Sequence, residues 1–441
     1  MKQFFAALDR FFFKWVSATG FGMMRSAWGA IVFWSMLLQW PEIARYYGRE
    51  GMLPPESWHI VFRQVYRFSI LDYVSDERIL FALYLLLLIA AFCSMLGLRA
   101  RVSTIITCLL LFSFQERNPM ILAGGEALLR VVGFLLMIAP GISAFSLDRA
   151  KFQLKSWTKN KERLPPLQMP MWPYRLLLWQ LIVLYITSGW DKLSGDMWWN
   201  GTAIEAVLRL ETFTEPWAEP VIPFLSAQTL ALSRLTVLYE WTWFVLLIPA
   251  VLWKRIGFTA HGIKRVVLFF GVIFHTGIAI VMSVGTFPYA IMAAYLGLLH
   301  EKDHEALRAR INRLRYGKIV VLYDGACGFC RRSIAWLEMC DWLHRLTPED
   351  FTVPAARKRV ASDIEEKELD RAMHVRIAYK NQKWKDAKIL KGFYAARTLT
   401  WHMPPFWLLA PFLYIPGVSL IGKKIYASIA KKRQNATAQP A

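Results

Sequence analysis

The stretch ILFALYLLLLIAAFCSMLG, residues 79–97, contains no charged side chain in nineteen positions. A helix of about 20 apolar residues crosses the hydrocarbon core of a bilayer, so this stretch predicts a transmembrane helix. Similar apolar runs occupy residues 126–147, 174–190, 235–253, 266–283 and 286–299, and weaker ones occupy 25–40 and 102–114. We therefore predict a polytopic α-helical membrane protein with about eight transmembrane helices.

The composition and charge of the chain indicate which kind of molecule it binds. Of the 441 residues, 56% are hydrophobic, which excludes a disordered chain. The formal charge of +21 suggests a polyanion as partner, either nucleic acid or anionic lipid. Because no helix-turn-helix, zinc finger or RNA-binding motif accompanies this charge, we expect the lipid bilayer as a partner and no nucleic acid.

Basic residues gather in alternate connecting segments and set the expected orientation. By the positive-inside rule these segments are cytoplasmic, with both termini on that side. We expect an integral protein of the plasma membrane, the inner membrane of a bacterium. In residues 2–15, aromatic and leucine side chains recur at helical spacing beside Lys2, Arg10 and Lys14, which predicts an interfacial amphipathic helix. The basic residues of the segments expected to be cytoplasmic are Lys2, Arg10, Lys14, Arg99, Arg101, Arg149, Lys151, Lys155, Lys159, Lys161, Arg163, Lys254, Arg255, Lys264, Arg265 and those from Lys302 to Lys318.

The long apolar runs end with the expected membrane domain, residues 1–300. A basic linker, 301–317, leads to a small α/β domain at 318–434, and the polar tail 435–441 is expected to be disordered. The expected order in the small domain is a strand at 319–323, a helix at 329–342, a strand at 344–347, a polar helix at 360–372, a strand at 374–379, a turn at 380–383, a further strand and then helices.

Two cysteines, Cys327 and Cys330, follow the strand at 319–323 and open the next helix. Unpaired N–H groups and the dipole at a helix N-terminus favour an anion, so Cys327 is expected to supply a nucleophilic thiolate. Cys330, one turn deeper, would resolve the mixed disulfide with a thiol or disulfide partner protein. Nearby glycines allow close backbone approach, and an arginine adds positive charge. These supporting residues are Tyr323, Asp324, Gly325, Gly328 and Arg331.

Two other interpretations of the cysteine pair are half of a zinc site and an inert pair of thiols. Structural zinc needs four ligands, and no second Cys-x-x-Cys or paired histidine motif follows within residues 318–434. The redox interpretation is therefore favoured, and no metal is expected.

Several further motifs accompany the cysteine pair. They are Tyr323-Asp324-Gly325, His374-Val375, Leu413-Tyr414-Ile415-Pro416-Gly417-Val418 and Tyr426. With these motifs, nearly all of residues 318–434 resembles the DCC (DUF393) thiol-disulfide oxidoreductase-like family. The resemblance implies a thioredoxin-like fold. Ala372-Met373, without a proline, precede the strand at His374, so substrate handling is expected to differ from that of thioredoxin itself.

Ionisable residues beside membrane spans are functional candidates by default. The densest such stretch, residues 188–201, contains Lys192. A lysine in apolar surroundings loses its proton more readily, because desolvation disfavours the ammonium, and can then act as a general base. Alternatively, Lys192 extends to the headgroups or pairs with Asp191 or Asp196. The second candidate, His275, either handles protons or makes a hydrogen bond between helices.

Motifs in the membrane domain carry a second resemblance. They are Gly189-x-x-Lys192-Leu193, Trp199-x-Gly201, Phe274-His275, Ser283-x-Gly285-x-Phe287-Pro288-Tyr289, Met95-Leu96-Gly97-Leu98-x-x-Arg101 and Ser146-Leu147-Asp148. Residues 20–300 thereby resemble the HTTM family, which is related to vitamin K-dependent γ-carboxylase. In this resemblance Lys192 falls on the catalytic lysine, which deprotonates reduced vitamin K. A quinone or vitamin K-like hydroquinone is therefore the implied candidate cofactor.

Three departures separate this chain from the carboxylase. Asn118-Pro119-Met120-Ile121 stands where the carboxylase has Asn-His-Ser-Tyr, and the polar residues that follow its histidine are missing after His275. The large lumenal region for the substrate propeptide is also absent. Glutamyl carboxylation is therefore not expected, and a quinone, a lipid or a small molecule is the expected substrate class.

These observations favour a membrane protein with thiol-disulfide oxidoreductase activity in its C-terminal domain and a γ-carboxylase-like membrane domain. The alternative is non-enzymatic: a transporter, channel or export and maturation factor in which the cysteine pair senses redox state.

Overall fold

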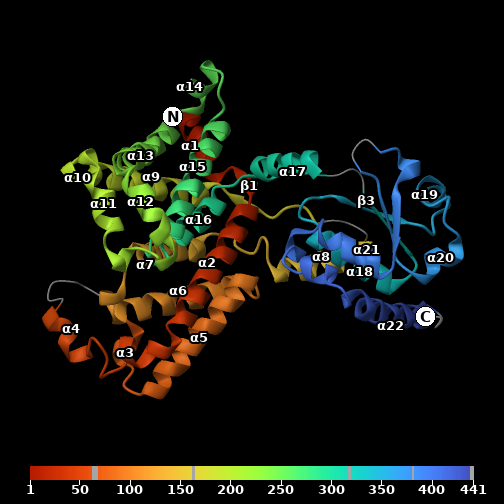
Figure 1. Ribbon diagram of the computed structural model, residues 1–441, viewed down its shortest axis with the longest axis horizontal. Coiled ribbons are helices and arrows are strands. Elements are labelled where there is room, and N and C mark those ends of the chain that lie inside the picture. Colours follow the sequence, from red (N-terminus) through yellow and green to blue (C-terminus); the bar gives the residue numbers. More distant parts are fainter. Residues whose placement is uncertain (62–67, 161–163, 316–318, 380–381, 438–441) are drawn as a thin grey trace. The chain divides into compact units, whose positions relative to one another are not determined.

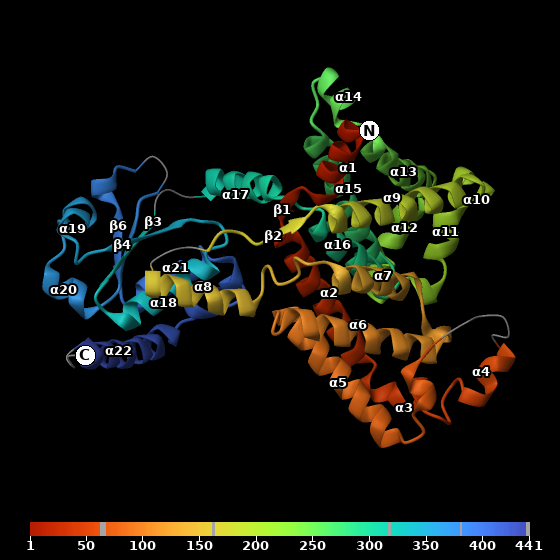
Figure 2. The same ribbon diagram turned by 180° about the vertical axis from the view of Figure 1, so that it is seen from behind.

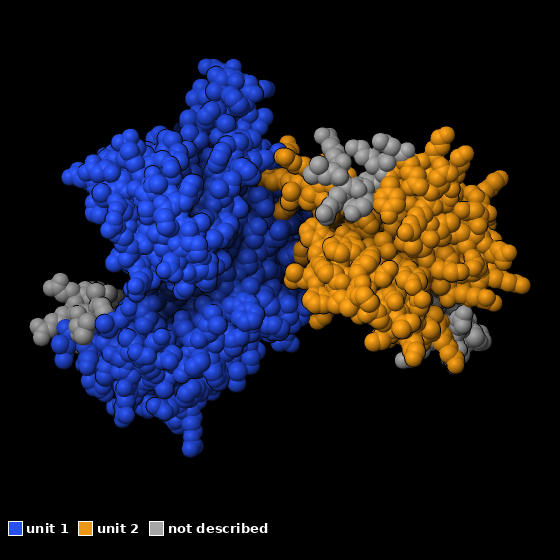
Figure 3. Space-filling view, viewed as in Figure 1, with its two compact units in different colours: residues 1–148, 166–301 blue, residues 149–165, 302–441 orange. Residues whose placement is uncertain are grey.

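The computed structural model describes residues 1–61, 68–160, 164–315, 319–379 and 382–437. The chain divides into two compact units, coloured separately in Figure 3. The membrane unit comprises Met1–Asp148 and Pro166–Glu301, and the thiol unit comprises Arg149–Pro165 and Lys302–Ala441. A segment from the middle of the sequence therefore belongs to the same unit as the C-terminal domain.

The membrane unit is built almost wholly from helices (Figures 1 and 2). Its longer helices are α1 (Lys2–Phe13), α2 (Thr19–Leu38), α5 (Glu77–Leu96), α6 (Ala100–Arg117), α7 (Gly124–Ile138), α9 (Trp172–Leu193), α13 (Thr229–Thr242), α15 (Ala260–Val281) and α16 (Phe287–Gly297). Its shorter helices are α3 (Ile43–Tyr47), α4 (Pro55–Val61), α10 (Asp196–Asn200), α11 (Thr202–Leu208), α12 (Ile222–Ser226) and α14 (Ala250–Arg255). One antiparallel pair of strands, β1 (Trp15–Ser17) and β2 (Gln168–Pro170), joins distant segments.

Within the described residues, four helical segments are long and apolar enough to cross a membrane. They are Thr19–Leu38, Glu77–Leu96, Thr229–Leu247 and Ala260–Val281. Each overlaps one of the predicted runs. The run at 126–147 differs from the prediction, since α7 ends at Ile138 and Pro140 disfavours helix at the residue before it. The count of about eight spans stays a prediction.

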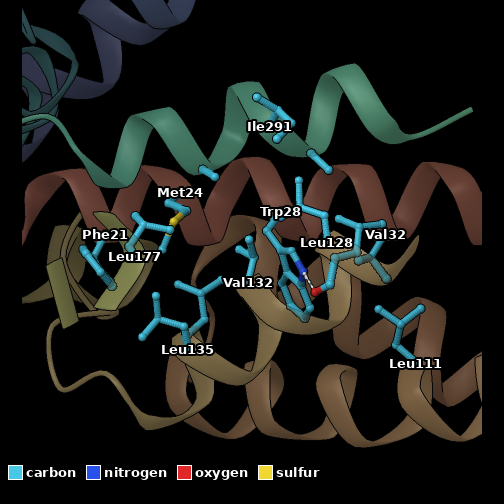
Figure 4. Packing of buried hydrophobic residues seen from close by; sticks show 14 of the residues in the cluster. Phe21, Met24, Trp28, Val32, Leu111, Leu128, Val132, Leu135, Leu177 and Ile291 are labelled. Carbon is cyan, nitrogen blue, oxygen red and sulfur yellow. Dashed lines mark hydrogen bonds between the residues drawn. The ribbon is translucent and has the colours of Figure 1, made fainter. Parts of the chain in front are cut away.

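The core of the membrane unit surrounds Trp28 of α2 (Figure 4). Trp28 is fully buried, and its indole Nε1 donates a hydrogen bond to the carbonyl of Leu129 at 2.9 Å. The next residue, Gly29, lets α2 approach α5 closely, because a Cβ there would lie 2.6 Å from the backbone nitrogen of Met95. Helix α2 thus packs against its neighbours in two ways: the large side chain of Trp28 fills the core, and the lack of a side chain at Gly29 lets α5 come close.

A charged side chain lies inside the same core. Arg25 of α2 is fully buried, and its guanidinium donates to the carbonyls of Ile142 at 2.9 Å and Phe145 at 2.7 Å. It also donates to the carbonyl of Ser94, near the end of α5. Carbonyls at helix ends and in turns lack intrahelical donors, and the guanidinium supplies them. Arg25 therefore fixes the turn from which α8 (Leu147–Asn160) begins.

The thiol unit contains a four-stranded sheet in the order β4-β3-β5-β6. Strand β3 is parallel to β4 and antiparallel to β5, and β5 is antiparallel to β6. The strands are β3 (Ile319–Tyr323), β4 (Leu346–Asp350), β5 (His374–Ile377) and β6 (Lys388–Lys391). The helices are α8, α17 (Glu301–Arg315), α18 (Gly328–Cys340), α19 (Pro354–Val360), α20 (Glu366–Arg371), α21 (Phe393–Thr400) and α22 (Val418–Thr437).

Helices cover both faces of this sheet. Ile319, Val321 and Tyr323 of β3 join a buried cluster with residues of α18 and α21. The alternate residues Val320 and Leu322 join a second cluster with residues of α19 and α20. Because all five β3 residues are buried, their unbroken apolar run is that of a central strand covered on both sides.

Helix α8 completes the first of these clusters, although it precedes β3 by more than 150 residues in sequence. Trp157 of α8 is 6% exposed, and its ring centroid lies 6.0 Å from that of Tyr323. Leu154, one turn earlier, packs against the same cluster. The chain therefore supplies part of the core of the thiol unit from the segment between α7 and α9.

Several predicted elements of the C-terminal part have different bounds in the structure. Strand β4 begins at Leu346 rather than 344, and residues 354–360 form α19 because Pro354 suits the first helical turn. The basic segment 301–317 is helical through Arg315, and the tail 435–441 is helical through Thr437. Residues 316–318, 380–381 and 438–441 lie outside the described residues.

The packing of Trp157 predicts that α8 stabilises the thiol unit. Trp157→Ala should lower the free energy of unfolding of that unit by about 3–5 kcal/mol, the usual cost of deleting a buried tryptophan. Pulse proteolysis of the full chain in a urea series measures this. Trp336→Ala, at a position that is 52% exposed, is the matched control and should change stability by about 0.5 kcal/mol or less. Equal effects would contradict the role of α8.

Candidate functional site

The cysteine pair lies at the start of α18. Cys327 is the N-cap residue, and Cys330 lies within the first turn. The backbone N–H of Cys330 donates to the Sγ of Cys327 at 3.3 Å, and the two residues are not joined in a disulfide. The contact therefore directs a backbone donor of the first helical turn at the sulfur of Cys327.

Two carboxylates hold the loop that carries the pair. Asp324 Oδ1 accepts hydrogen bonds from the backbone N–H of Ala326 at 2.9 Å and of Cys327 at 3.2 Å. Asp350, the last residue of the parallel strand β4, accepts from the N–H of Gly325 at 3.0 Å through its Oδ1. A Cβ on Gly325 would lie 1.7 Å from Asp350 Oδ2, so this close approach requires glycine.

Both cysteines are buried, with Cys327 2% and Cys330 8% exposed. They share a cluster with Tyr323 and Trp157. Burial raises the pKa of the Tyr323 phenol to about 12, and the nearby Asp350 carboxylate adds to this rise. Tyr323 therefore keeps its proton throughout the pH range in which thiols exchange, and the Arg331 guanidinium is the cation in this set that opposes the rise.

One aspartate and the two cysteines also form a candidate metal site. The ligand atoms of Asp324, Cys327 and Cys330 lie within 4.8 Å of one another. Three ligands are one fewer than structural zinc requires, and Asp324 Oδ1 already accepts two backbone hydrogen bonds. The arrangement therefore suits thiol chemistry better than zinc binding.

In the membrane unit, Lys192 pairs with a carboxylate that was not among the predicted partners. Its Nζ lies 2.9 Å from Glu240 Oε1 of α13 and donates to Ser188 Oγ at 2.6 Å. Ser188 Oγ lies 3.1 Å from the same Glu240 oxygen. The Nζ also lies 5.1 Å from the ring centroid of Trp198. Lys192 therefore belongs to a half-buried group formed by α9, α10 and α13, instead of pairing with Asp191 or Asp196.

His275 belongs to a separate buried group of tyrosines. Its Nε2 lies 2.6 Å from the hydroxyl of Tyr185, which also contacts the hydroxyl of Tyr295. Tyr239 and Tyr295 share a hydrogen bond of 3.0 Å, and Gly271 leaves room for both hydroxyls. His275 thus makes the interhelix hydrogen bond that was one of its two predicted roles. Its Nδ1 is buried with no hydrogen-bond partner within the described part of the chain.

Trp199 and Gly201 lie beside the Lys192 group. Trp199 Nε1 donates to the carbonyl of Leu193 at 3.1 Å, which holds the turn after α9. Gly201 has φ +81°, and a Cβ there would lie 2.6 Å from the Cα of Leu230. These two residues therefore position α10 against α13, and they contact the candidate base only indirectly.

Sequence reasoning missed Glu240, Asp350, Trp157 and the tyrosine group. Glu240 had a usable signal, because an acidic residue inside the apolar run 235–253 needs a cationic partner. Asp350 and Trp157 gave no comparable signal, because their partners lie across the fold. Only the tertiary structure identifies them.

The loop geometry predicts opposite outcomes for two neighbouring glycines. Gly325→Ala should displace the cysteine loop from Asp350 at a cost of about 1–3 kcal/mol and should reduce alkylation of Cys327. Gly328→Ala is the matched control, because the nearest heavy atom to its added Cβ is Arg331 Nη2 at 4.0 Å. Mass-spectrometric alkylation rates at Cys327 test this. A wild-type rate in Gly325→Ala would contradict the proposed loop restraint.

Comparison with known protein families agrees with both resemblances. A model described as the HTTM domain matches residues 13–303, and one described as a DCC1-like thiol-disulfide oxidoreductase matches residues 321–439. No match was found among curated proteins or solved structures. The first match covers more than half of the chain, and the two matches confirm the predicted fusion. The chain therefore belongs to the HTTM family and carries a C-terminal DCC1-like thiol-disulfide oxidoreductase domain.

Proposed function

We propose that the thiol unit exchanges disulfides with a partner protein, with Cys327 as nucleophile and Cys330 as the resolving thiol. The observation that carries this proposal is the hydrogen bond from the Cys330 N–H to Cys327 Sγ at the start of α18. A backbone donor directed at Cys327 Sγ suits this sulfur as the attacking one, and Cys330 lies within one helical turn of it.

The exchange balances as a two-electron transfer. The Cys327 thiolate attacks one sulfur of the partner disulfide, which forms a mixed disulfide and releases the other sulfur as a thiolate that takes up a proton. Cys330 then loses its proton and attacks Cys327, which forms the Cys327–Cys330 disulfide and releases the second partner thiol. The partner gains two electrons and the pair loses them. The reverse sequence oxidises a dithiol partner.

The sheet topology supports a thioredoxin-like fold for this unit. A parallel β-α-β unit, β3-α18-β4, is followed by the antiparallel hairpin-like pair β5 and β6, with β3 central. The cysteines then lie where the first strand meets its helix, as the resemblance implies. Ala372 and Met373, without a proline, precede β5, so partner recognition is proposed to differ from that of thioredoxin.

Removing the resolving thiol tests the proposal. Cys330→Ser should trap a covalent adduct on Cys327 that a reductant releases, because the second attack is lost. Non-reducing gels and peptide mass spectrometry of the affinity-purified full chain detect it. Cys340→Ser, at the other end of α18, should trap nothing, and neither should the double variant Cys327→Ser/Cys330→Ser. An adduct at equal level in all three variants would refute the exchange mechanism.

We further propose that Lys192 acts as a general base on a quinone, a lipid or a small molecule. The supporting observation is the group of Lys192, Ser188 and Glu240. Glu240 Oε2 and Trp241 Nε1 are buried there without hydrogen-bond partners among the described residues, so an acceptor and a donor are available to a hydroxyl- or carbonyl-bearing ligand. A hydroquinone would supply an ionisable hydroxyl and reducing equivalents to this group.

The ion pair between Lys192 and Glu240 limits how a ligand could reach the lysine amine. Lys192 Nζ donates to Glu240 Oε1 at 2.9 Å and to Ser188 Oγ at 2.6 Å. A ligand would reach Nζ by taking the place of Glu240, with Ser188 keeping Nζ oriented.

Oxygen uptake separates the two candidate chemistries. Lys192→Ala should lower hydroquinone-dependent oxygen uptake by the purified full chain by about 10²–10⁴-fold, the usual contribution of a general base. Cys327→Ser, in the other unit, should leave it unchanged. If uptake is absent and the reconstituted protein moves a solute independently of Lys192, the non-enzymatic transporter is the better description.

The proposed topology has about eight spans and both termini on the cytoplasmic face of the plasma membrane. Charge asymmetry between the connecting segments supports it. A cysteine introduced at exposed Glu365 of a Cys-free full chain should react with a membrane-impermeant maleimide only after right-side-out vesicles are opened. Labelling of intact right-side-out vesicles would invert the topology.

A further inference from the structure

The thiol unit exposes an apolar surface near its C-terminus. We define this apolar C-terminal surface by Leu408, Phe412, Ile415, Leu420, Ile421 and Ile425, which are 51–89% exposed. Soluble proteins rarely expose a contiguous apolar patch of this kind, and larger patches mark contacts with proteins or membranes.

Helix α22 contributes Leu420, Ile421 and Ile425 to this surface, because its other side packs against the thiol unit. The hydroxyl of Tyr426 accepts a hydrogen bond from the Met373 N–H at 2.8 Å. Gly422 lies against α21, where an added Cβ would lie 2.2 Å from the ring of Phe393. Ile421 and Ile425, one turn apart, remain exposed. An apolar stripe that faces outward is the reverse of the pattern in a soluble protein.

The charge of the segment that carries this surface is of one sign. Residues 401–441 contain five lysines and arginines and no aspartate or glutamate. Lys424 and Lys431 are exposed on α22, one position before Ile425 and six after it. Apolar side chains flanked by lysines without acidic neighbours fit the headgroup region of an anionic leaflet.

The connections between the two units favour a bilayer as the occupant. The chain passes between the units after Asp148, after Pro165 and after Glu301. Three covalent connections to a membrane unit hold the thiol unit near the bilayer, so docking costs little additional translational entropy.

We propose that the apolar C-terminal surface inserts into the headgroup region of an anionic lipid leaflet and docks the thiol unit on the membrane. The docking does not depend on thiol exchange, because neither Cys327 nor Cys330 belongs to this surface. It goes beyond the proposed function by adding a lipid partner to the soluble part of the chain.

A fluorescent probe at Leu408 tests the docking in the full chain. All five native cysteines are replaced by serine, and Leu408→Cys is labelled with NBD in nanodiscs of phosphatidylcholine with or without phosphatidylglycerol. Emission should shift to the blue with phosphatidylglycerol, and headgroup-depth spin-labelled lipid should quench it. The same label at Lys367→Cys, on α20 over the opposite face of the sheet, should show neither change.

Charge variants give a second, graded test. Lys424→Gln and Lys431→Gln should each shift the docked population about fivefold toward the undocked form, the effect of one lysine at an anionic surface. Lys358→Gln and Lys367→Gln, exposed on α19 and α20, are matched controls and should not shift it. Higher salt should weaken docking of the wild-type surface because ions screen the attraction.

Two outcomes would overturn the proposal. Water-like emission at Leu408 in both lipids would mean that the surface stays in solvent. A blue shift without quenching by labelled lipid would mean that protein, either the membrane unit or a second copy, covers it. A photocrosslinking residue at Leu408 in the native cysteine background should yield lipid adducts, and protein adducts alone would again refute docking.

Discussion

The fully buried guanidinium of Arg25 forms hydrogen bonds with the segments that meet where the chain leaves the membrane unit. A charge within a helix that is long and apolar enough to cross a bilayer is costly unless its donors are used. Here they bind carbonyls of the turn after α7 and of the end of α5. Gly97, with φ +71°, lets the same turn approach, since a Cβ there would lie 2.4 Å from the Ser146 Cβ. The path of the chain into α8 depends on this cluster.

Each candidate reactive group is organised by a carboxylate from another element. Asp350 of β4 holds the loop before Cys327, and Glu240 of α13 holds Lys192. The two carboxylates act in opposite ways. Asp350 accepts hydrogen bonds from backbone N–H groups, whereas Glu240 binds the side-chain amine of Lys192 itself. The cysteine loop is therefore held through its backbone, and the lysine is held through its own amine.

Local patterns predicted the parts of the fold that depend on neighbouring residues. The β3 strand, the helix opening at Cys327 and most of the apolar runs follow from short windows of sequence, because burial and capping act over a few positions. Lys192 and Glu240 are 48 positions apart, and Gly325 and Asp350 are 25 apart. Such pairs form only when the helices and strands pack, so no spacing rule could identify them. The end of α7 at Ile138 shows the same limit of hydropathy, which does not register the backbone effect of Pro140.

The position of α8 in the sequence has a consequence for biosynthesis. Trp157 leaves the ribosome about 160 residues before Tyr323, its partner in the core of the thiol unit. At roughly 5–20 residues per second, α8 waits on the order of 10–30 s without that core. During this interval its apolar side needs a temporary neighbour, either the membrane surface or a chaperone. The thiol unit can thus complete its core only late in synthesis, although α8 is made early. A truncated product that lacks the rest of this core would leave Trp157 exposed to quality-control proteases.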